Sequence, residues 1–153
     1  MRRIWDDFID MPPVWLLWFL LAAWVQSNIW NPLDYSSAIA IWMGRAWIFA
    51  GIFLMLWAFL MFRRHKTSVI PKRTPKTILK EGPYRFSRNP IYVADAMILL
   101  GFVLTQGSVL SLVLVPLFMR VIRKRFIDGE EARIAQEFGP AFEEYRRQTR
   151  RWL

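Results

Sequence analysis

Long apolar runs alternate with short polar segments along the first four fifths of the chain. Four such runs stand out, at residues 14–30, 46–62, 91–105 and 109–119, and only residues 106–108 separate the last two. As α-helices, the first two runs would each extend about 26 Å at roughly 1.5 Å per residue, which is close to the thickness of a bilayer core. The last two are shorter, so we expect a tight helical hairpin that tilts, thins the bilayer or crosses it only in part. The pattern predicts an all-α integral membrane protein with about four transmembrane helices.

The pattern changes beyond Arg120, where apolar side chains recur at roughly helical spacing among charged ones. Gly139-Pro140 interrupts this stretch, so we expect two amphipathic helices on either side of it. We expect these helices to lie along the cytoplasmic face with their apolar sides on the membrane or on the 63–90 loop. The apolar positions are Phe126, Ile127, Ile134, Phe138, Phe142 and Tyr145.

Positive charge is concentrated in two segments. The chain carries 21 Lys and Arg against 12 Asp and Glu, which gives a net charge of +9. Residues 63–90 and 120–153 contain most of the basic side chains, whereas the short connections at 31–36 and 106–108 contain none. The positive-inside rule therefore predicts that both termini and the 63–90 loop are cytoplasmic, in an inner or plasma membrane. With so much apolar sequence, the expected partner of the basic segments is anionic lipid and not nucleic acid.

Cysteine is absent and histidine occurs once, at His65. The chain therefore offers no disulfide framework, no thiolate nucleophile and no metal site based on cysteine. We expect no metal centre.

Residues 82–92 form a basic loop, rich in glycine and proline, that leads into the third apolar run. Pro90 is well placed to begin a helix, and Asn89 before it can cap that helix. Arg88, Asn89 and the helix N-terminus together suit an anionic group such as a carboxylate or phosphate. Tyr84 and Tyr92 can stack on a base or line a cation pocket. The alternative is an ordinary helix start whose arginines reach toward lipid headgroups.

Three acidic residues are candidates for chemistry. Glu130 and Glu131 are adjacent, so on a helix they point about 100° apart and cannot share one role. A carboxylate beside an apolar wall can hold an amine or a sulfonium, and the alternative is a solvated face paired with Arg125 or Arg133. Asp95 lies one turn inside the third apolar run, where acids are costly and often functional. The sequence leaves both a structural and a functional interpretation of Asp95 open.

The order and spacing of these motifs resemble the membrane methyltransferase superfamily of isoprenylcysteine carboxyl methyltransferases and phospholipid N-methyltransferases. The resemblance covers about residues 80–153, and in it a helical hairpin separates the first two motifs from the last two. Three positions depart from the superfamily pattern: Asn89 replaces a histidine, Ala94 a glycine and Phe142 a tyrosine. The matching segments are Gly82-Pro83-Tyr84, Arg88-Asn89-Pro90-Ile91-Tyr92-Val93-Ala94, Glu130-Glu131 and Phe138-Gly139-Pro140-Ala141-Phe142-Glu143-Glu144-Tyr145.

The resemblance implies an enzyme that transfers a methyl group from S-adenosylmethionine to a lipid or other amphiphile at the cytoplasmic membrane face. It also implies a single domain over residues 1–153, with two N-terminal spans in 1–62 and the cofactor-binding half in 80–153. By analogy, Arg88 and Glu130 would be catalytic. The cofactor-binding residues would be Tyr84, Asn89, Pro90, Tyr92, Glu130 and Glu131.

Two other functions fit parts of the sequence. Tyr92-Val93-Ala94-Asp95 looks like a motif of membrane sterol reductases, which use NADPH but have many more helices. The chain is also compatible with a small non-enzymatic membrane subunit whose basic faces bind anionic lipid.

Overall fold

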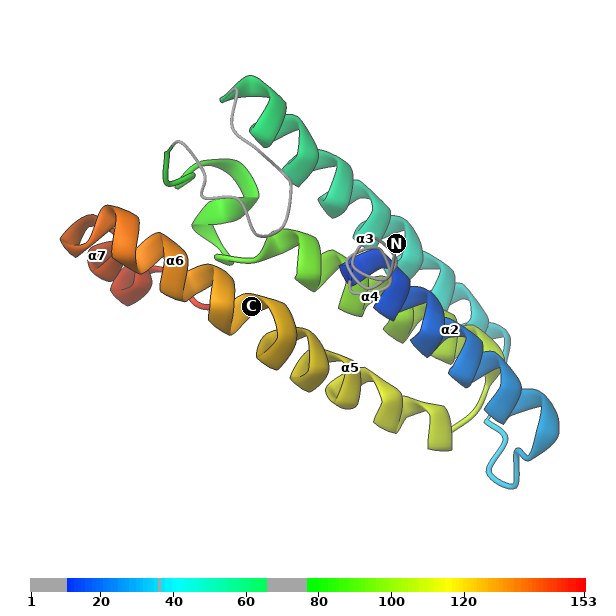
Figure 1. Cartoon of the computed structure of the whole chain (residues 1–153). Helices are drawn as coiled ribbons and strands as arrows, with labels where there is room; N and C mark the ends of the chain where they lie inside the picture. Colours follow the sequence, from blue (N-terminus) through cyan, green and yellow to red (C-terminus); the bar gives the residue numbers. More distant parts are fainter. Residues whose placement is uncertain (1–10, 36, 66–76) are drawn as a thin grey trace, which may run out of the picture.

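A computed structural model of the protein describes residues 11–35, 37–65 and 77–153. All regular structure in these residues is helical, as the apolar runs predict (Figure 1). The main helices are α2 (Pro12–Ile29), α3 (Ala38–Arg64), α4 (Pro90–Gln106), α5 (Leu114–Ile122), α6 (Asp128–Phe138) and α7 (Pro140–Gln148). Short 3₁₀ turns at Gly82–Arg85 and Leu110–Val113 precede α4 and α5, and a π-helical turn at Arg123–Ile127 joins α5 to α6.

Local sequence signals set most helix ends. The Ser37 side chain accepts a hydrogen bond from the backbone N–H of Ala40 and so caps α3. Pro90 begins α4, where its missing N–H is not needed. Gly107 ends α4 with φ of 66°, a left-handed conformation that glycine adopts without strain. Gly139, with φ of 47°, separates α6 from α7, so the predicted break at Gly139-Pro140 is confirmed.

Helices α3 and α4 are the closest pair, and glycines allow their backbones to approach. A Cβ atom added at Gly44 would lie 2.5 Å from the carbonyl oxygen of Gly101, and one added at Gly101 would lie equally close to the Gly44 carbonyl. Seven residues further along α3, a Cβ at Gly51 would lie 2.9 Å from the carbonyl oxygen of Ala94. The two helices therefore pack antiparallel through small residues, as is common between helices in membranes.

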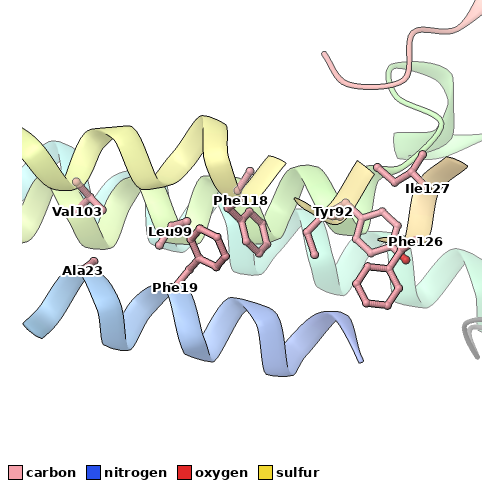
Figure 2. Close-up of a cluster of buried hydrophobic side chains, with 10 residues drawn as sticks. Phe19, Ala23, Tyr92, Leu99, Val103, Phe118, Phe126 and Ile127 are labelled. Carbon is pink, nitrogen blue, oxygen red and sulfur yellow. The ribbon is translucent and has the colours of Figure 1, made fainter. Parts of the chain in front are cut away.

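The main apolar core lies between α2, α4 and the α5–α6 segment (Figure 2). Phe19 of α2 meets Phe118 of α5 edge to face, with ring centroids 5.3 Å apart. Leu99 and Val103 of α4 are fully buried beside them. Further toward α6, Tyr92 stacks on Phe126 at 6.5 Å. Helix α4 is thus central, with α3 packed on one side and α2 and α5 on another.

The end of the molecule at the α4–α5 turn is held by polar contacts. The Gln26 side-chain oxygen accepts hydrogen bonds from the hydroxyls of Ser108 and Ser111, both fully buried. The backbone N–H of Tyr35 donates to the Gly107 carbonyl at 2.9 Å. The connection between α2 and α3 is therefore fixed against the turn between α4 and α5.

The observed helices differ from the predicted spans at several ends. The second span was expected to begin at residue 46, after Arg45, but α3 already begins at Ala38. Arg45 fits inside this apolar helix because its guanidinium lies over the Trp42 ring, 5.0 Å from the centroid. The fourth run does not stop at residue 119, because α5 continues through the π-helical turn into α6. The 3₁₀ geometry changes to α at Leu114, two residues before Pro116.

Among the described residues, one helix is both long and apolar enough to cross a membrane, namely α3. Helix α4 is apolar but shorter. Many large apolar side chains of α3 are exposed, including Phe49 and Phe53, which are 72% and 69% exposed. Such a surface suits lipid and not water.

We predict that replacing Gly44 or Gly101 by alanine destabilises the protein by about 1–3 kcal/mol, because the added methyl group forces α3 and α4 apart. Thermal unfolding in detergent measures the effect. Gly129→Ala in α6 is the matched control, since its Cβ would meet only the Arg133 guanidinium at 3.6 Å. That variant should gain about 0.5–1 kcal/mol from helix propensity. Equal behaviour of all three variants would contradict the close packing.

Candidate functional site

The segment before α4 is a tight turn that packs against α3. Gly82 has φ of 57°, and a Cβ atom there would lie 3.1 Å from the Met61 sulfur, so the position favours glycine for two reasons. The 3₁₀ turn that follows buries Tyr84, whose ring meets Phe62 at 5.6 Å and nearly at right angles. Burial raises the pKa of Tyr84 above its usual value, so its hydroxyl stays protonated.

Helix α7 is joined to this turn by one buried hydrogen bond. The Tyr145 hydroxyl donates to the backbone carbonyl of Tyr84 at 2.7 Å. Burial raises the pKa of Tyr145 as well, so the donor keeps its proton. The predicted tail motif therefore meets the predicted loop motif directly.

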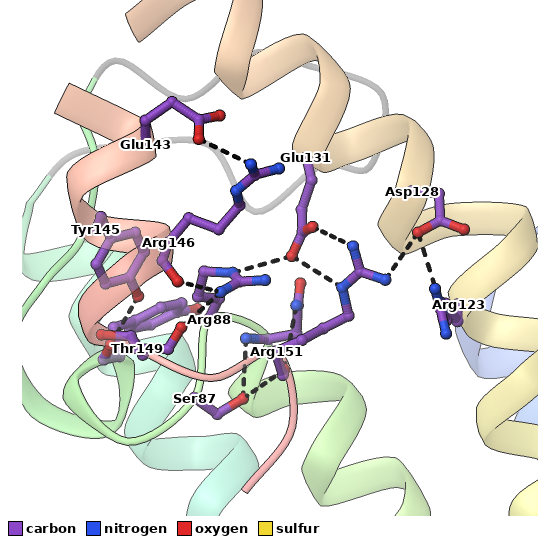
Figure 3. A network of polar contacts seen from close by, with 12 residues as sticks. Ser87, Arg88, Arg123, Asp128, Glu131, Glu143, Tyr145, Arg146, Thr149 and Arg151 are labelled. Atoms are coloured by element: carbon purple, nitrogen blue, oxygen red, sulfur yellow. Dashed lines mark hydrogen bonds and ion pairs between the residues drawn. The ribbon is translucent and has the colours of Figure 1, made fainter. Parts of the chain in front are cut away.

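Arg88 and Glu131 form the central ion pair of the site (Figure 3). Arg88 Nε lies 3.0 Å from Glu131 Oε1, and both side chains are buried, with about a tenth of each exposed. Arg151 approaches the same carboxylate from the other side, with Nη2 at 2.5 Å from Oε2. Burial by itself opposes the charge on Glu131, but hydrogen bonds from Arg151 and Arg88 hold its pKa below the usual value.

The C-terminal segment runs alongside residues 87–89. The backbone N–H of Arg88 donates to the Arg150 carbonyl at 2.9 Å, and the Ser87 hydroxyl donates to the Arg151 carbonyl at 3.0 Å. Asn89 Nδ2 also donates to the Arg151 carbonyl, at 3.3 Å. The Arg88 guanidinium reaches further, to the backbone carbonyls of Arg146 and Thr149. Arg88 therefore connects the loop, α6 and the chain after α7.

Ser87 and Arg151 did not stand out in the sequence, although both belong to this network. Ser87 is buried and also accepts a hydrogen bond from the backbone N–H of Asn89. Arg151 belongs to a run of basic residues in which the sequence gives no reason to prefer one over another. Its pairing depends on backbone contacts between segments about sixty residues apart.

Glu130 has surroundings different from those of Glu131, as their adjacent helical positions predict. Its carboxylate accepts a hydrogen bond from the Tyr92 hydroxyl at 2.9 Å. Burial raises the pKa of Glu130, while the bond from Tyr92 and the charge of Arg133 act in the opposite direction. Of the two arginines that the sequence offered as partners, Arg133 acts on Glu130 through its charge, whereas Glu131 pairs with Arg88 and Arg151.

These side chains surround one cavity of about 380 Å³, a size typical of small-molecule sites. Met11 at the start of α2, Met55 of α3 and Ile134 of α6 add apolar surface, and Asp95 of α4 adds a further acid. Every residue that the sequence indicated for catalysis or cofactor binding lines the cavity: Tyr84, Arg88, Asn89, Pro90, Tyr92, Glu130 and Glu131.

The wall of the cavity carries more acidic than basic side chains among the described residues. Arg88 is the one cation among the described lining residues, and it is engaged by Glu131. Glu130 and Asp95 remain as acids that no lining cation neutralises. With aromatic rings close by, such a cavity suits a ligand that carries positive charge.

The chain was also compared with models of protein families. A model of the phospholipid methyltransferase family matches residues 39–141, which is more than half of the chain and runs from α3 to the start of α7. Searches among curated proteins and among solved structures found no match. Proteins of this family transfer the methyl group of S-adenosylmethionine, and their membrane setting agrees with the apolar surface of α3. The family match favours this transferase activity over the reductase and the non-enzymatic subunit that the sequence left open. The chain therefore belongs to the phospholipid methyltransferase family, a family of membrane enzymes that use S-adenosylmethionine.

Proposed function

We propose that this protein methylates a phospholipid headgroup at the cytoplasmic face of an inner or plasma membrane. The observation that carries the proposal is the cavity bounded by the 82–92 segment, the Glu130–Glu131 pair and the apolar start of α2. A polar cofactor from the cytosol and an amphiphilic acceptor from the lipid can both reach a cavity that has one polar and one apolar side.

The lining residues suit S-adenosylmethionine in charge and shape. The acid Glu130, together with the Tyr92 ring, would hold positive charge. Tyr84 would offer an aromatic face and Pro90 an apolar contact to an adenine ring. The amide of Asn89 already donates to the Arg151 carbonyl, so its role is to hold the loop in place and not to transfer a proton. When bound, S-adenosylmethionine supplies an electrophilic methyl group attached to a sulfonium.

The residues of the chain would contribute mainly by positioning. A methyl transfer is an in-line displacement, and holding two reactants in line can supply roughly 7–11 kcal/mol of the barrier. Arg88 was expected to be catalytic. Its Nε and Nη1 atoms are engaged by protein partners, which supports a role in fixing Glu131 and the loop. Nη2 makes no hydrogen bond to the described residues and would orient an anionic phosphate of the acceptor.

We further propose that residues 1–153 form one domain with four membrane segments, α2, α3, α4 and α5. The lengths of α2 and α4, and the extension of α5 into α6, support segments that tilt or thin the bilayer and that end in polar helices at the cytoplasmic face.

The absence of cysteine makes this topology simple to test. We predict that Leu33→Cys, in the exposed first connection, reacts with an impermeant maleimide on intact cells, because the connection is extracytoplasmic. Gln148→Cys, exposed at the end of α7, should react only after the cells are permeabilised. The opposite labelling pattern would reverse the proposed orientation.

The cofactor site is tested by Glu130→Gln. We predict at least a tenfold loss of affinity for S-adenosylhomocysteine and S-adenosylmethionine in calorimetry, the latter affected more because it carries the sulfonium charge. Binding to the unaltered protein at one hundred times Kd should stabilise it by about 2.7 kcal/mol. Glu137→Gln, which removes an exposed acid of the same helix, is the control and should bind both ligands normally. Unchanged affinity in Glu130→Gln would remove Glu130 from the site.

The ion pair predicts a pH-dependent stability. Glu131→Gln leaves the buried Arg88 without its charge partner, so we expect a loss of about 3–5 kcal/mol near neutral pH. Because the pKa of Glu131 is lowered by folding, its contribution is lost as pH falls below the ordinary glutamate value of about 4.3. Unfolding curves of the two proteins should therefore converge in acid, and a constant gap across the pH range would contradict the pairing. Glu137→Gln again serves as the control.

A further inference from the structure

Asp95 is a buried acid for which the proposed cofactor site has no use. It lies in α4 one turn beyond Tyr92, and only 3% of its surface is exposed. It also lines the cavity, so its buried position is next to open space and not inside packed side chains. At about 1.5 Å per residue it lies roughly 8 Å along the helix from Pro90, inside the apolar sequence of α4.

The other charged residues of the cavity wall have polar partners. Arg88 and Glu131 pair with each other, Arg151 reinforces Glu131, and Glu130 accepts a hydrogen bond from Tyr92. Within the described part of the chain, Asp95 makes no hydrogen bond and no ion pair. An acid buried in this way is costly unless a cation or a proton donor approaches it. The cavity is the route by which such a group can arrive.

The two acids that no described lining cation neutralises, Glu130 and Asp95, lie at different places along the cavity wall. Glu130 is held by Tyr92 beside the polar loop, where the cofactor is expected. Asp95 lies about one turn further along the apolar helix α4, away from that loop, and the cavity wall also includes the apolar side chains of Met11 and Met55. A lipid that enters from the bilayer would therefore bring its headgroup to Asp95 first.

We propose that Asp95 binds the ammonium of an amine headgroup and takes its proton before methyl transfer. This inference rests on the proposed function. A protonated amine has no lone pair for attack, so the Asp95 carboxylate first accepts one proton and the amine becomes neutral. The nitrogen lone pair then forms the new N–C bond as the S–C bond breaks, and the electron pair of that bond stays on sulfur. Asp95 afterwards releases its proton to water through the cavity. Each methyl group transferred thus corresponds to one proton released.

Asp95→Asn tests the proposal because it keeps the size of the side chain and removes the base. We expect transfer to a phospholipid with an ethanolamine headgroup to fall by about 10²–10³-fold, the usual contribution of a general base. The affinity for S-adenosylhomocysteine and the midpoint of thermal unfolding should stay the same or rise, because an unpaired buried charge has been removed. Binding of a short-chain ethanolamine phospholipid without the methyl donor should weaken by about tenfold.

A second acceptor separates proton removal from positioning. Two fluorine atoms on the carbon next to the aminomethyl group of the headgroup make the amine far less basic, so that it is largely neutral at neutral pH. The rate ratio between the unaltered protein and Asp95→Asn should then shrink toward one, since no proton needs to be removed. Asp95→Ala, which leaves space, should recover activity on the ordinary lipid when formate is added, and this variant also serves if Asp95→Asn folds poorly.

Equal losses on both acceptors, or no loss on either, would overturn the role of Asp95. The same holds if Asp95→Asn no longer binds S-adenosylhomocysteine, because the residue would then belong to the cofactor site. If the unaltered protein methylates no amine phospholipid, the proposed function fails first, so the two failures are distinguishable.

Discussion

The carboxylate of Glu131 is the point on which the polar half of the molecule depends. It receives Arg88 from the segment before α4 and Arg151 from the segment after α7, and both contacts are largely shielded from water. The cluster of Glu131, Arg88 and Arg151 is stable only while all three members are present. Removal of a partner would leave a buried or half-buried charge without an opposite charge beside it. The arrangement holds the segment before α4 against α6, and residues of both line the cavity. It also neutralises Arg88, the one cation among the lining residues that the structure describes, so the acids Glu130 and Asp95 dominate the charge of the cavity wall.

The apolar helices are held together by close packing and not by ion pairs. Helices α3 and α4 are joined by backbone proximity at glycines and not by charge, so their separation is set by sterics alone. Helix α4 also contains Pro90, Tyr92 and Asp95, so its packing against α3 fixes the position of these three residues in the site. A rigid helix positions reacting groups better than a loop does. The chemistry of the family needs positioning more than covalent help, and this construction suits it.

Much of the fold could be read from the sequence, because apolar runs, prolines and glycines act locally. Gly107 and Gly139 ended helices where expected, and the angle between successive helical residues correctly gave Glu130 and Glu131 different surroundings. The start of α3 was placed too late, since the stacking of Arg45 on Trp42 makes a charge tolerable there in a way that composition does not reveal. The partners of Glu131 were also missed. The sequence suggested nearby arginines, whereas the observed partners are 43 and 20 residues away and depend on how the tail packs on the loop.

The pairing of residues 87–89 with the segment after α7 has a consequence for how the protein is made. The two segments in contact lie about sixty residues apart in the sequence. Arg88 is therefore synthesised long before the carbonyl groups and the carboxylate to which it donates hydrogen bonds. Membrane helices can be inserted as they emerge, but this contact closes a long loop and forms only when the last helices have docked. Integration into the bilayer and completion of the cavity are therefore separate steps of maturation. A chain arrested between them would be an embedded precursor with an open, unpaired arginine, distinguishable from the finished enzyme by its susceptibility to proteases at the loop.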